Sequence, residues 1–274
     1  MKTIHYHDEG TGFPIVWIHG FPFSSKIFEP QLTIDQFRHI RVDLRGFGKT
    51  PPPEGETSMA TYARDVLDVM DDAKIDRAVI AGLSMGGYIA MQLLRDASER
   101  VAALLLLDTR ETADTAEGRA TRFQQAGEVA KNGIGGVVEA MIPKVAVGSE
   151  AREAVRKIME ESSPQGAIAA LKAMAARPDS AETLRSATVP ALVVVGDRDE
   201  ITPPRDAERM VSLLQNAEEA PIAKAAHAAN FERPEQLNPL IHAFLFRHVL
   251  RPGGESILKR GADVSSAQAA RQRG

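Results

Sequence analysis

The amino-acid sequence predicts an α/β fold, built on a mostly parallel, doubly wound β-sheet with helices on both faces. Short apolar runs rich in β-branched residues recur along the chain, as is typical of buried parallel strands. Stretches in which apolar residues recur at helical spacing separate several of these runs. Glycine or polar residues follow each run, at the carboxyl ends of strands where open α/β sheets place their functional sites.

The predicted strands are five apolar runs and two weaker segments. The apolar runs are residues 15–18, 40–42, 78–81, 104–107 and 191–195. A weak strand is expected shortly before His227, and His5 and His7 alternate as they would on an edge strand. The spacing of His5 and His7 also suits a metal site, but no third ligand lies nearby, which favours the edge strand.

Helices are predicted at residues 59–74, 88–97 and 235–250, where apolar side chains recur at three- and four-residue spacing. Residues from about 112 to 184 break the alternation of strands and helices and contain helical patterns only. These patterns cover residues 116–131, 134–141, 151–161 and 165–177, with Pro143, Pro164 and Pro178 at their boundaries. Consecutive helices without a strand predict a lid over the site.

The sequence therefore divides into a core, an inserted helical cap and a tail. The core comprises residues 1–111 and 185–250, and the cap comprises residues 112–184. Residues 251–274 contain few large apolar side chains and are expected to form a mobile C-terminal tail. No stretch approaches the about 18–20 continuous apolar residues that span a bilayer, and residues 1–10 lack the apolar centre of a secretory signal.

The composition excludes several classes of protein. The 33 basic and 37 acidic residues leave a net charge of −4, which is unfavourable for a nucleic-acid-binding surface. The absence of cysteine excludes disulfide frameworks, cysteine nucleophiles and thiolate metal sites. We therefore expect a soluble, cytoplasmic protein, monomeric or homodimeric, that acts on a small molecule and binds neither nucleic acid nor membranes.

The strongest chemical motif is Gly-Leu-Ser-Met-Gly at residues 82–86, which follows a predicted strand and precedes a predicted helix. A sharp strand-to-helix turn of this kind holds a serine in a strained conformation with its Oγ exposed. The flanking glycines let neighbouring backbone approach closely. Ser84 is therefore the predicted nucleophile, and the N–H of Met85 is the first predicted donor of an oxyanion hole.

A serine hydroxyl needs a base to act as a nucleophile at neutral pH. His227 lies between the last weak strand and the closing helix, which favours it over the other histidines as that base. The base in turn needs an orienting carboxylate, and spacing alone does not choose among the acids that follow apolar strands. These acids are Asp108, Asp197, Asp199 and Glu200.

The second oxyanion donor is expected in the loop after the strand at residues 15–18. His19, Gly20, Phe21 and Pro22 form this loop. Pro22 has no backbone N–H, so the N–H of Phe21 is the predicted donor.

Together these motifs resemble the α/β-hydrolase superfamily over residues 1 to about 250. The matching segments are residues 19–22, 43–48, 82–88 and 196–204, followed by His227 and residues 232–235. Nucleophile, acid and base follow in the chain order that this fold uses. In relatives the acid is the fourth residue of the Gly-x-x-Asp element at residues 196–199, so the resemblance selects Asp199.

Within the superfamily, the chain is most similar to small microbial carboxylesterases and to 3-oxoadipate enol-lactonase-like hydrolases, whose cap is a small helical insertion. The segments at residues 107–110 and 174–180 carry this finer resemblance. One departure is Ala226, which stands where relatives usually have glycine before the catalytic histidine. An alanine would be strained there if the backbone needed a positive φ.

The resemblance implies a serine carboxylesterase that hydrolyses small or short-chain esters through an acyl-enzyme, with no metal or organic cofactor. A lactonase, an enol-lactonase or a carbon–carbon bond hydrolase would use the same three residues, and formation of peracids is a further side activity of this machinery. The alternative from another class is a non-catalytic ligand-binding protein on the same fold.

Overall fold

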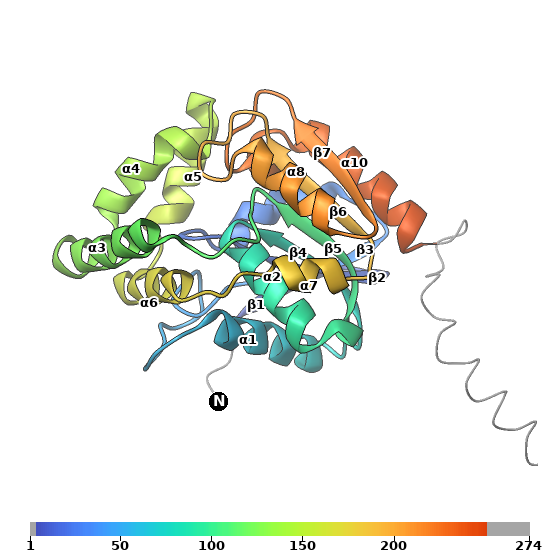
Figure 1. Ribbon diagram of the computed structural model, residues 1–274, viewed down its shortest axis with the longest axis horizontal. Helices are drawn as coiled ribbons and strands as arrows, with labels where there is room; N and C mark the ends of the chain where they lie inside the picture. The colour runs from blue at the N-terminus through green and yellow to red at the C-terminus, as the bar shows by residue number, and fades with distance from the viewer. Residues whose placement is uncertain (1–3, 251–274) are drawn as a thin grey trace, which may run out of the picture.

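The computed structural model describes residues 4–250 and contains a seven-stranded β-sheet (Figure 1). The strands are β1 Tyr6–Gly10, β2 Phe13–Ile18, β3 Phe37–Val42, β4 Ala78–Leu83, β5 Val101–Leu107, β6 Ala191–Gly196 and β7 Ala217–Ile222. They lie in the order β1-β3-β2-β4-β5-β6-β7. β1 runs antiparallel to β3, and every other neighbouring pair is parallel. The predicted mostly parallel sheet is therefore confirmed.

The five apolar runs of the sequence form the inner strands β2 to β6. β4 and β5 lie in the middle of the sheet, and all of their residues are buried. The two weaker segments, β1 and β7, form the edges and keep exposed residues. Because β4 lies between β2 and β5, the segment that follows it begins at the centre of the carboxyl edge of the sheet.

Helices cover both faces of the sheet, as the sequence predicts. The first face carries α1 Met59–Asp72, α2 Met85–Asp96 and α8 Pro204–Leu213, and the opposite face carries η1 Ser25–Thr33 and α10 Pro234–His248. Alternating residues of β2 enter the two cores: Val16 and Ile18 pack on the α1 side, and Trp17 packs on the η1 side. The remaining short helices are η2 Ser98–Arg100, α7 Ala181–Ser186 and α9 Ala229–Glu232.

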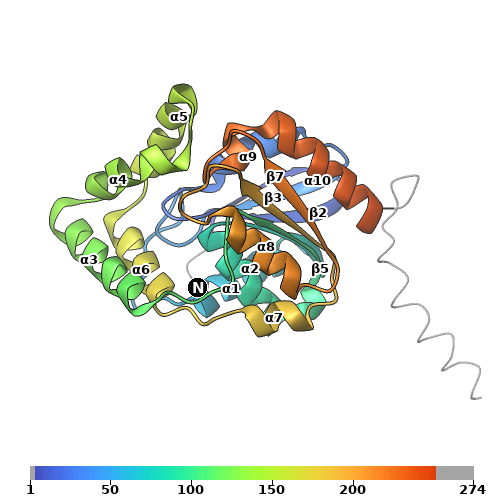
Figure 2. The same ribbon diagram turned by 45° about the horizontal axis from the view of Figure 1, so that its top comes forward.

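Between β5 and β6 the described chain contains no strand, and four longer helices precede the short α7 there. They are α3 Ala116–Asn132, α4 Gly135–Val145, α5 Ser149–Glu160 and α6 Pro164–Ala175. α3 packs against α6 and α4 against α5, and Figures 1 and 2 show the four helices grouped on one side of the molecule. We call residues 112–184 the insertion.

Local sequence determines where α3 and α6 begin. The side chains of Thr115 and Ser163 cap α3 and α6 by accepting N–H bonds, and Pro164 occupies the first turn of α6, where its missing N–H is tolerated. The predicted boundary at Pro143 is wrong, because α4 continues through this residue to Val145.

No helix within residues 4–250 is both long and apolar enough to cross a membrane. The C-terminal tail expected at residues 251–274 lies outside the described residues.

Candidate active site

Ser84 lies in a tight elbow between the end of β4 and the start of α2. Its backbone angles are φ 54° and ψ −114°, a strained conformation for a residue with a side chain. The elbow depends on its glycines, because a Cβ added to Gly86 would lie 1.9 Å from the carbonyl oxygen of Ile18, and one added to Gly82 would lie 2.3 Å from that of Gly86. This close packing holds the Ser84 side chain at the carboxyl edge of the sheet.

The hydroxyl of Ser84 meets the imidazole of His227. Ser84 Oγ lies 2.8 Å from His227 Nε2, although 143 positions separate the two residues in the chain. His227 lies between β7 and α9 and is 1% exposed, and Ser84 is 9% exposed. A hydroxyl so placed can pass its proton to the imidazole as it attacks an electrophile.

Among the four candidate acids, Asp199 is the one that contacts the imidazole. Its Oδ2 lies 2.8 Å from His227 Nδ1. Asp197 and Glu200 are exposed, and within residues 4–250 the acid that bonds to the imidazole is Asp199. The geometry matches the acid that the resemblance selects.

Three donors besides the imidazole hold the Asp199 carboxylate. The N–H groups of Ile201 and Thr202 donate to Oδ1 at 2.8 and 3.0 Å, and the Thr202 hydroxyl donates to Oδ2 at 2.6 Å. Burial opposes ionisation of Asp199, but the charge of His227 and these hydrogen bonds outweigh it and lower the pKa of the carboxyl. Sequence reasoning missed Thr202, since its role depends on the turn that brings its hydroxyl back to Asp199.

Asp108, the fourth candidate acid, makes no hydrogen bond to the imidazole but binds the backbone of the two loops that carry Asp199 and His227. Its carboxylate accepts the N–H of Gly196 at 2.8 Å and the N–H of Ala229 at 3.1 Å. These donors lie at the start of the Asp199 loop and just beyond His227, so Asp108 joins the two loops. Complete burial and the nearby charge of Asp199 raise the pKa of Asp108 well above its usual range.

The loop after β2 lies directly beside the elbow. A Cβ added to Gly20 would lie 3.0 Å from Ser84 Cβ and 2.9 Å from the Leu83 carbonyl oxygen. The backbone N–H groups of Phe21 and Met85 donate no hydrogen bond to another group within residues 4–250. Two free donors near Ser84 are what an oxyanion hole requires.

A buried histidine supports this loop. The N–H of Leu44 donates to His19 Nε2 at 3.0 Å, so the proton of the neutral ring lies on Nδ1, which donates to the carbonyl of Gly20 at 2.8 Å. Burial lowers the pKa of His19 to about 4, so the ring stays neutral at physiological pH. His19 thus ties the Gly20 turn to the loop after β3.

Comparison with known proteins decides the family. The sequence profile of the alpha/beta hydrolase family matches residues 15–240. The chain belongs to the α/β-hydrolase family. The resemblance found in the sequence is therefore confirmed, and with it the α/β-hydrolase fold.

Individual relatives cover nearly the whole chain. The AB hydrolase superfamily protein YisY of Bacillus subtilis is 32% identical over 260 residues, which cover 88% of this chain and 95% of YisY. A thermophilic esterase from Thermogutta terrifontis has 34% sequence identity and a TM-score of 0.87, and the match covers 90% of this chain and 94% of the esterase. The enol-lactonase of Burkholderia xenovorans LB400 has 24% identity and a TM-score of 0.82. The match covers 88% of this chain and 96% of the enol-lactonase, which shows that the two share a fold.

The departure at Ala226 does not strain this α/β-hydrolase. Ala226 is absent from the non-glycine residues with a positive φ, which among residues 4–250 are Gln36, Lys74, Ser84, Asp108 and Lys224. Alanine is therefore compatible with the backbone before His227, and glycine is not needed there.

The insertion contacts loops at the carboxyl edge of the sheet. Ser162 Oγ donates to the carbonyl of Pro22 at 2.6 Å, in the loop after β2. Ser163 Oγ donates to the carbonyl of Gly46 at 3.0 Å, in the loop after β3. Both loops leave the carboxyl ends of parallel strands, so the insertion lies against the same edge as Ser84.

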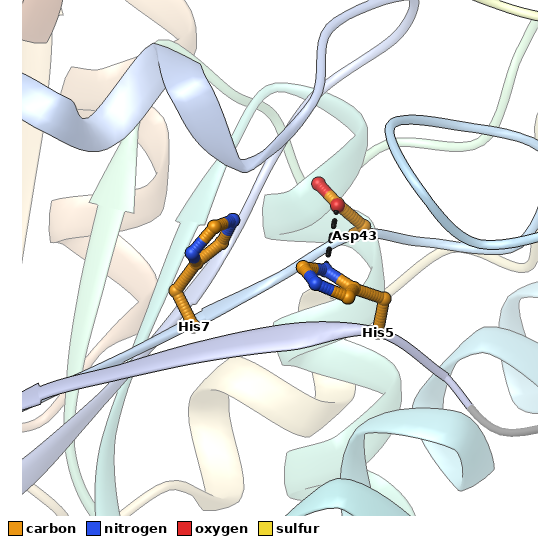
Figure 3. A group of neighbouring side chains, drawn as sticks. All are labelled: His5, His7 and Asp43. Atoms are coloured by element: carbon orange, nitrogen blue, oxygen red, sulfur yellow. Dashed lines mark hydrogen bonds and ion pairs between the residues drawn. The ribbon is translucent and has the colours of Figure 1, made fainter.

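The histidine pair near the N-terminus has a third neighbour that the sequence did not reveal. Ligand atoms of His5, His7 and Asp43 all lie within 4.8 Å of one another (Figure 3). The expectation that no third group lies nearby is therefore wrong, because folding brings the end of β3 against β1. Asp43 already accepts hydrogen bonds from the N–H groups of Ser25 and Lys49 as well as contacting His5 Nδ1 at 3.0 Å. These contacts make Asp43 a structural link between three segments.

Proposed function

We propose that this α/β-hydrolase is a serine carboxylesterase that hydrolyses small or short-chain carboxylic esters through an acyl-enzyme. The observation that carries the proposal is the continuous contact from Ser84 Oγ through the His227 imidazole to Asp199, with 2.8 Å at each step. The similar esterase from Thermogutta terrifontis, at 34% identity, supports an ester as the substrate.

In the proposed acylation step, Ser84 Oγ attacks the ester carbonyl carbon while His227 Nε2 takes the hydroxyl proton. The carbonyl oxygen becomes an oxyanion, which the N–H groups of Phe21 and Met85 stabilise. The imidazolium is held by the Asp199 carboxylate. His227 then gives its proton to the leaving alkoxide oxygen as the carbon–oxygen bond breaks, which leaves an acyl-serine and a free alcohol.

Deacylation repeats these steps with water. His227 takes a proton from water as the water oxygen attacks the acyl carbon. Collapse of the second oxyanion breaks the bond to Ser84 Oγ, which receives the proton back from His227. The products are the carboxylic acid and the free enzyme, so no proton or electron is left unaccounted for and no metal or organic cofactor takes part.

We also propose that residues 112–184 act as a cap and select the substrate. Their contacts with the loops after β2 and β3 support this role, because the first loop lies beside Ser84 and the second is joined to the first through His19. A lactone is a cyclic ester and would pass through the same steps, so the size and polarity of the space under the cap decide between the two substrates.

The proposal is tested with a fluorophosphonate probe and a short-chain p-nitrophenyl ester. The wild-type protein should be labelled and should turn the ester over, and Ser84→Ala should lose labelling and at least about four powers of ten in kcat. Ser98→Ala, an exposed serine, is the matched control and should behave as wild type. Activity of Ser84→Ala within tenfold of wild type would remove Ser84 from this role, and an unlabelled wild type would favour a ligand-binding protein.

A further inference from the structure

A buried carboxylate next to the active site has no part in the mechanism above. Glu232 lies at the end of α9, in the helix that follows His227, and is 6% exposed. Burying a carboxylate is unfavourable unless donors surround it. The partners of Glu232 therefore indicate what the residue does.

One oxygen of Glu232 holds the backbone immediately before His227. Its Oε2 accepts the N–H of Ala226 at 3.0 Å. This bond lies within the loop between β7 and α9, and it fixes the direction in which the chain enters the histidine.

The other oxygen of Glu232 holds the insertion. Its Oε1 accepts the N–H of Val147 at 2.7 Å and that of Gly148 at 2.8 Å. Gly148 is the N-cap of α5 and offers no side-chain cap of its own, so Glu232 caps α5 from a distant segment. A carboxylate is also favoured at this end of a helix by the helix dipole.

The same two segments make further backbone contacts. The N–H of Ala228 donates to the carbonyl of Val145 at 2.9 Å, and the N–H of His227 donates to the carbonyl of Lys144 at 3.4 Å. The end of α4 therefore lies along the loop that contains His227. Glu232 extends this contact to the next residues of the insertion, Val147 and Gly148.

We propose that Glu232 is a positioning residue, which aligns the His227 imidazole by binding the backbone before it to the α4–α5 connection of the insertion. The inference rests on the proposed function of Ser84 and His227. Its consequence is that the insertion, besides covering the site, helps to hold the base in line with the nucleophile.

Two substitutions separate this role from a general loss of packing. Glu232→Gln keeps the size of the side chain but replaces one of the two oxygens by an NH₂ group, which cannot accept a hydrogen bond. The variant therefore loses either the bond from Ala226 or the bonds from the insertion, depending on which way the amide faces. Gly148→Pro removes one donor from the insertion side, and the φ of −75° at this position suits proline. Gly148→Ala is the matched control, since its Cβ would lie 3.8 Å from Glu232 Oε1 and its N–H is kept.

The experiment measures kcat, KM and the rate of fluorophosphonate labelling at a temperature at which every variant is folded. Glu232→Gln and Gly148→Pro should each lower kcat and the labelling rate by about tenfold to a hundredfold, because a small displacement of the base slows proton transfer. KM should change less than kcat. Gly148→Ala and the exposed Glu235→Gln should match wild type.

Two results would overturn the proposal. The first is wild-type kcat and labelling in both variants, even if their melting temperatures fall, which would leave Glu232 a purely structural role. The second comes from hydrogen exchange of the wild-type protein. The amides of Ala226, Val147 and Gly148 should exchange at similar rates if they open together. Fast exchange at Val147 and Gly148 with slow exchange at Ala226 would contradict the coupling. Failure of the wild-type protein to label would instead count against the proposed function.

Discussion

The Oδ2 atom of Asp199 lies 2.8 Å from Nδ1 of His227, and the hydroxyl of Thr202 reaches the same oxygen at 2.6 Å. Burial opposes the charge on Asp199, but the imidazole and the hydrogen bonds from Thr202 outweigh it, so the pKa of the carboxyl lies below its usual range. The carboxylate therefore stays ionised next to the imidazole at neutral pH. That charge is available to orient the ring and to stabilise an imidazolium.

Replacing this acid tests its role directly. Asp199→Asn is expected to lower kcat for a p-nitrophenyl ester by about three to four powers of ten, because the neutral amide cannot stabilise the imidazolium and favours the wrong tautomer. Steady-state kinetics give the measurement, and Asp197→Asn, which alters an exposed neighbour, should leave kcat unchanged. A loss of less than tenfold in Asp199→Asn would mean that another group orients His227.

Asp108 should make stability depend on pH. Burial and the charge of Asp199 raise its pKa in the folded protein, whereas the unfolded chain has a carboxyl pKa of about 3.9. Between about pH 4 and the folded pKa, the folded protein therefore binds more protons than the unfolded chain does. The contribution of Asp108 to the free energy of unfolding falls as pH rises through this range to the folded pKa. Urea unfolding of wild type and Asp108→Asn across this range should show a flatter pH dependence in the variant, and parallel curves would contradict the prediction.

The backbone of Ser84 predicts a difference between two inactive variants. At φ 54° a Cβ is unfavourable and glycine is not, so Ser84→Gly should be more stable than Ser84→Ala by about 1 kcal/mol. Both variants lack the hydroxyl and should be equally inactive. Urea denaturation of the pair measures the difference, and equal stability would show that the elbow carries little strain.

The loop after β2, which we propose supplies one oxyanion donor, should be sensitive to a single added methyl group. The Cβ of Gly20→Ala would lie 3.0 Å from Ser84 Cβ and must push the loop away from the elbow. We expect kcat to fall by about tenfold to a hundredfold as the N–H of Phe21 moves. Gly55→Ala is the control, because a Cβ there meets nothing within 4 Å. Unchanged kcat in Gly20→Ala would place the second donor elsewhere.

Local sequence was enough to predict the inner strands and the elbow. Buried strands such as β5 are continuous apolar runs, so their signal does not depend on their partners. The edge strand β7 contains Glu218 and Glu219 and gave only a weak signal, since an edge strand keeps part of its surface in water. Pro143 marked a false boundary, because helix α4 tolerates it within its last turns.

Contacts made by long-range folding could not be read from the chain. Asp108 and Glu232 bind backbone N–H groups that only the folded sheet and insertion bring to them, whereas Thr202 reaches Asp199 through a local turn. The choice of Asp199 among neighbouring acids came from the resemblance, because the spacing of the residues alone left four candidates. The direction in which a loop carboxylate points is a property of the turn around it.

The insertion meets Glu232 through main-chain amides alone, at Val147 and Gly148. Side chains at these two positions can therefore change during evolution without loss of the contact, provided that both amides remain. If the insertion selects the substrate as proposed, helices α3 to α6 are then free to change while the two amides that bind Glu232 are kept. A chimera that receives the insertion of another relative should retain a well-aligned base only if the graft offers two consecutive amides at the same place.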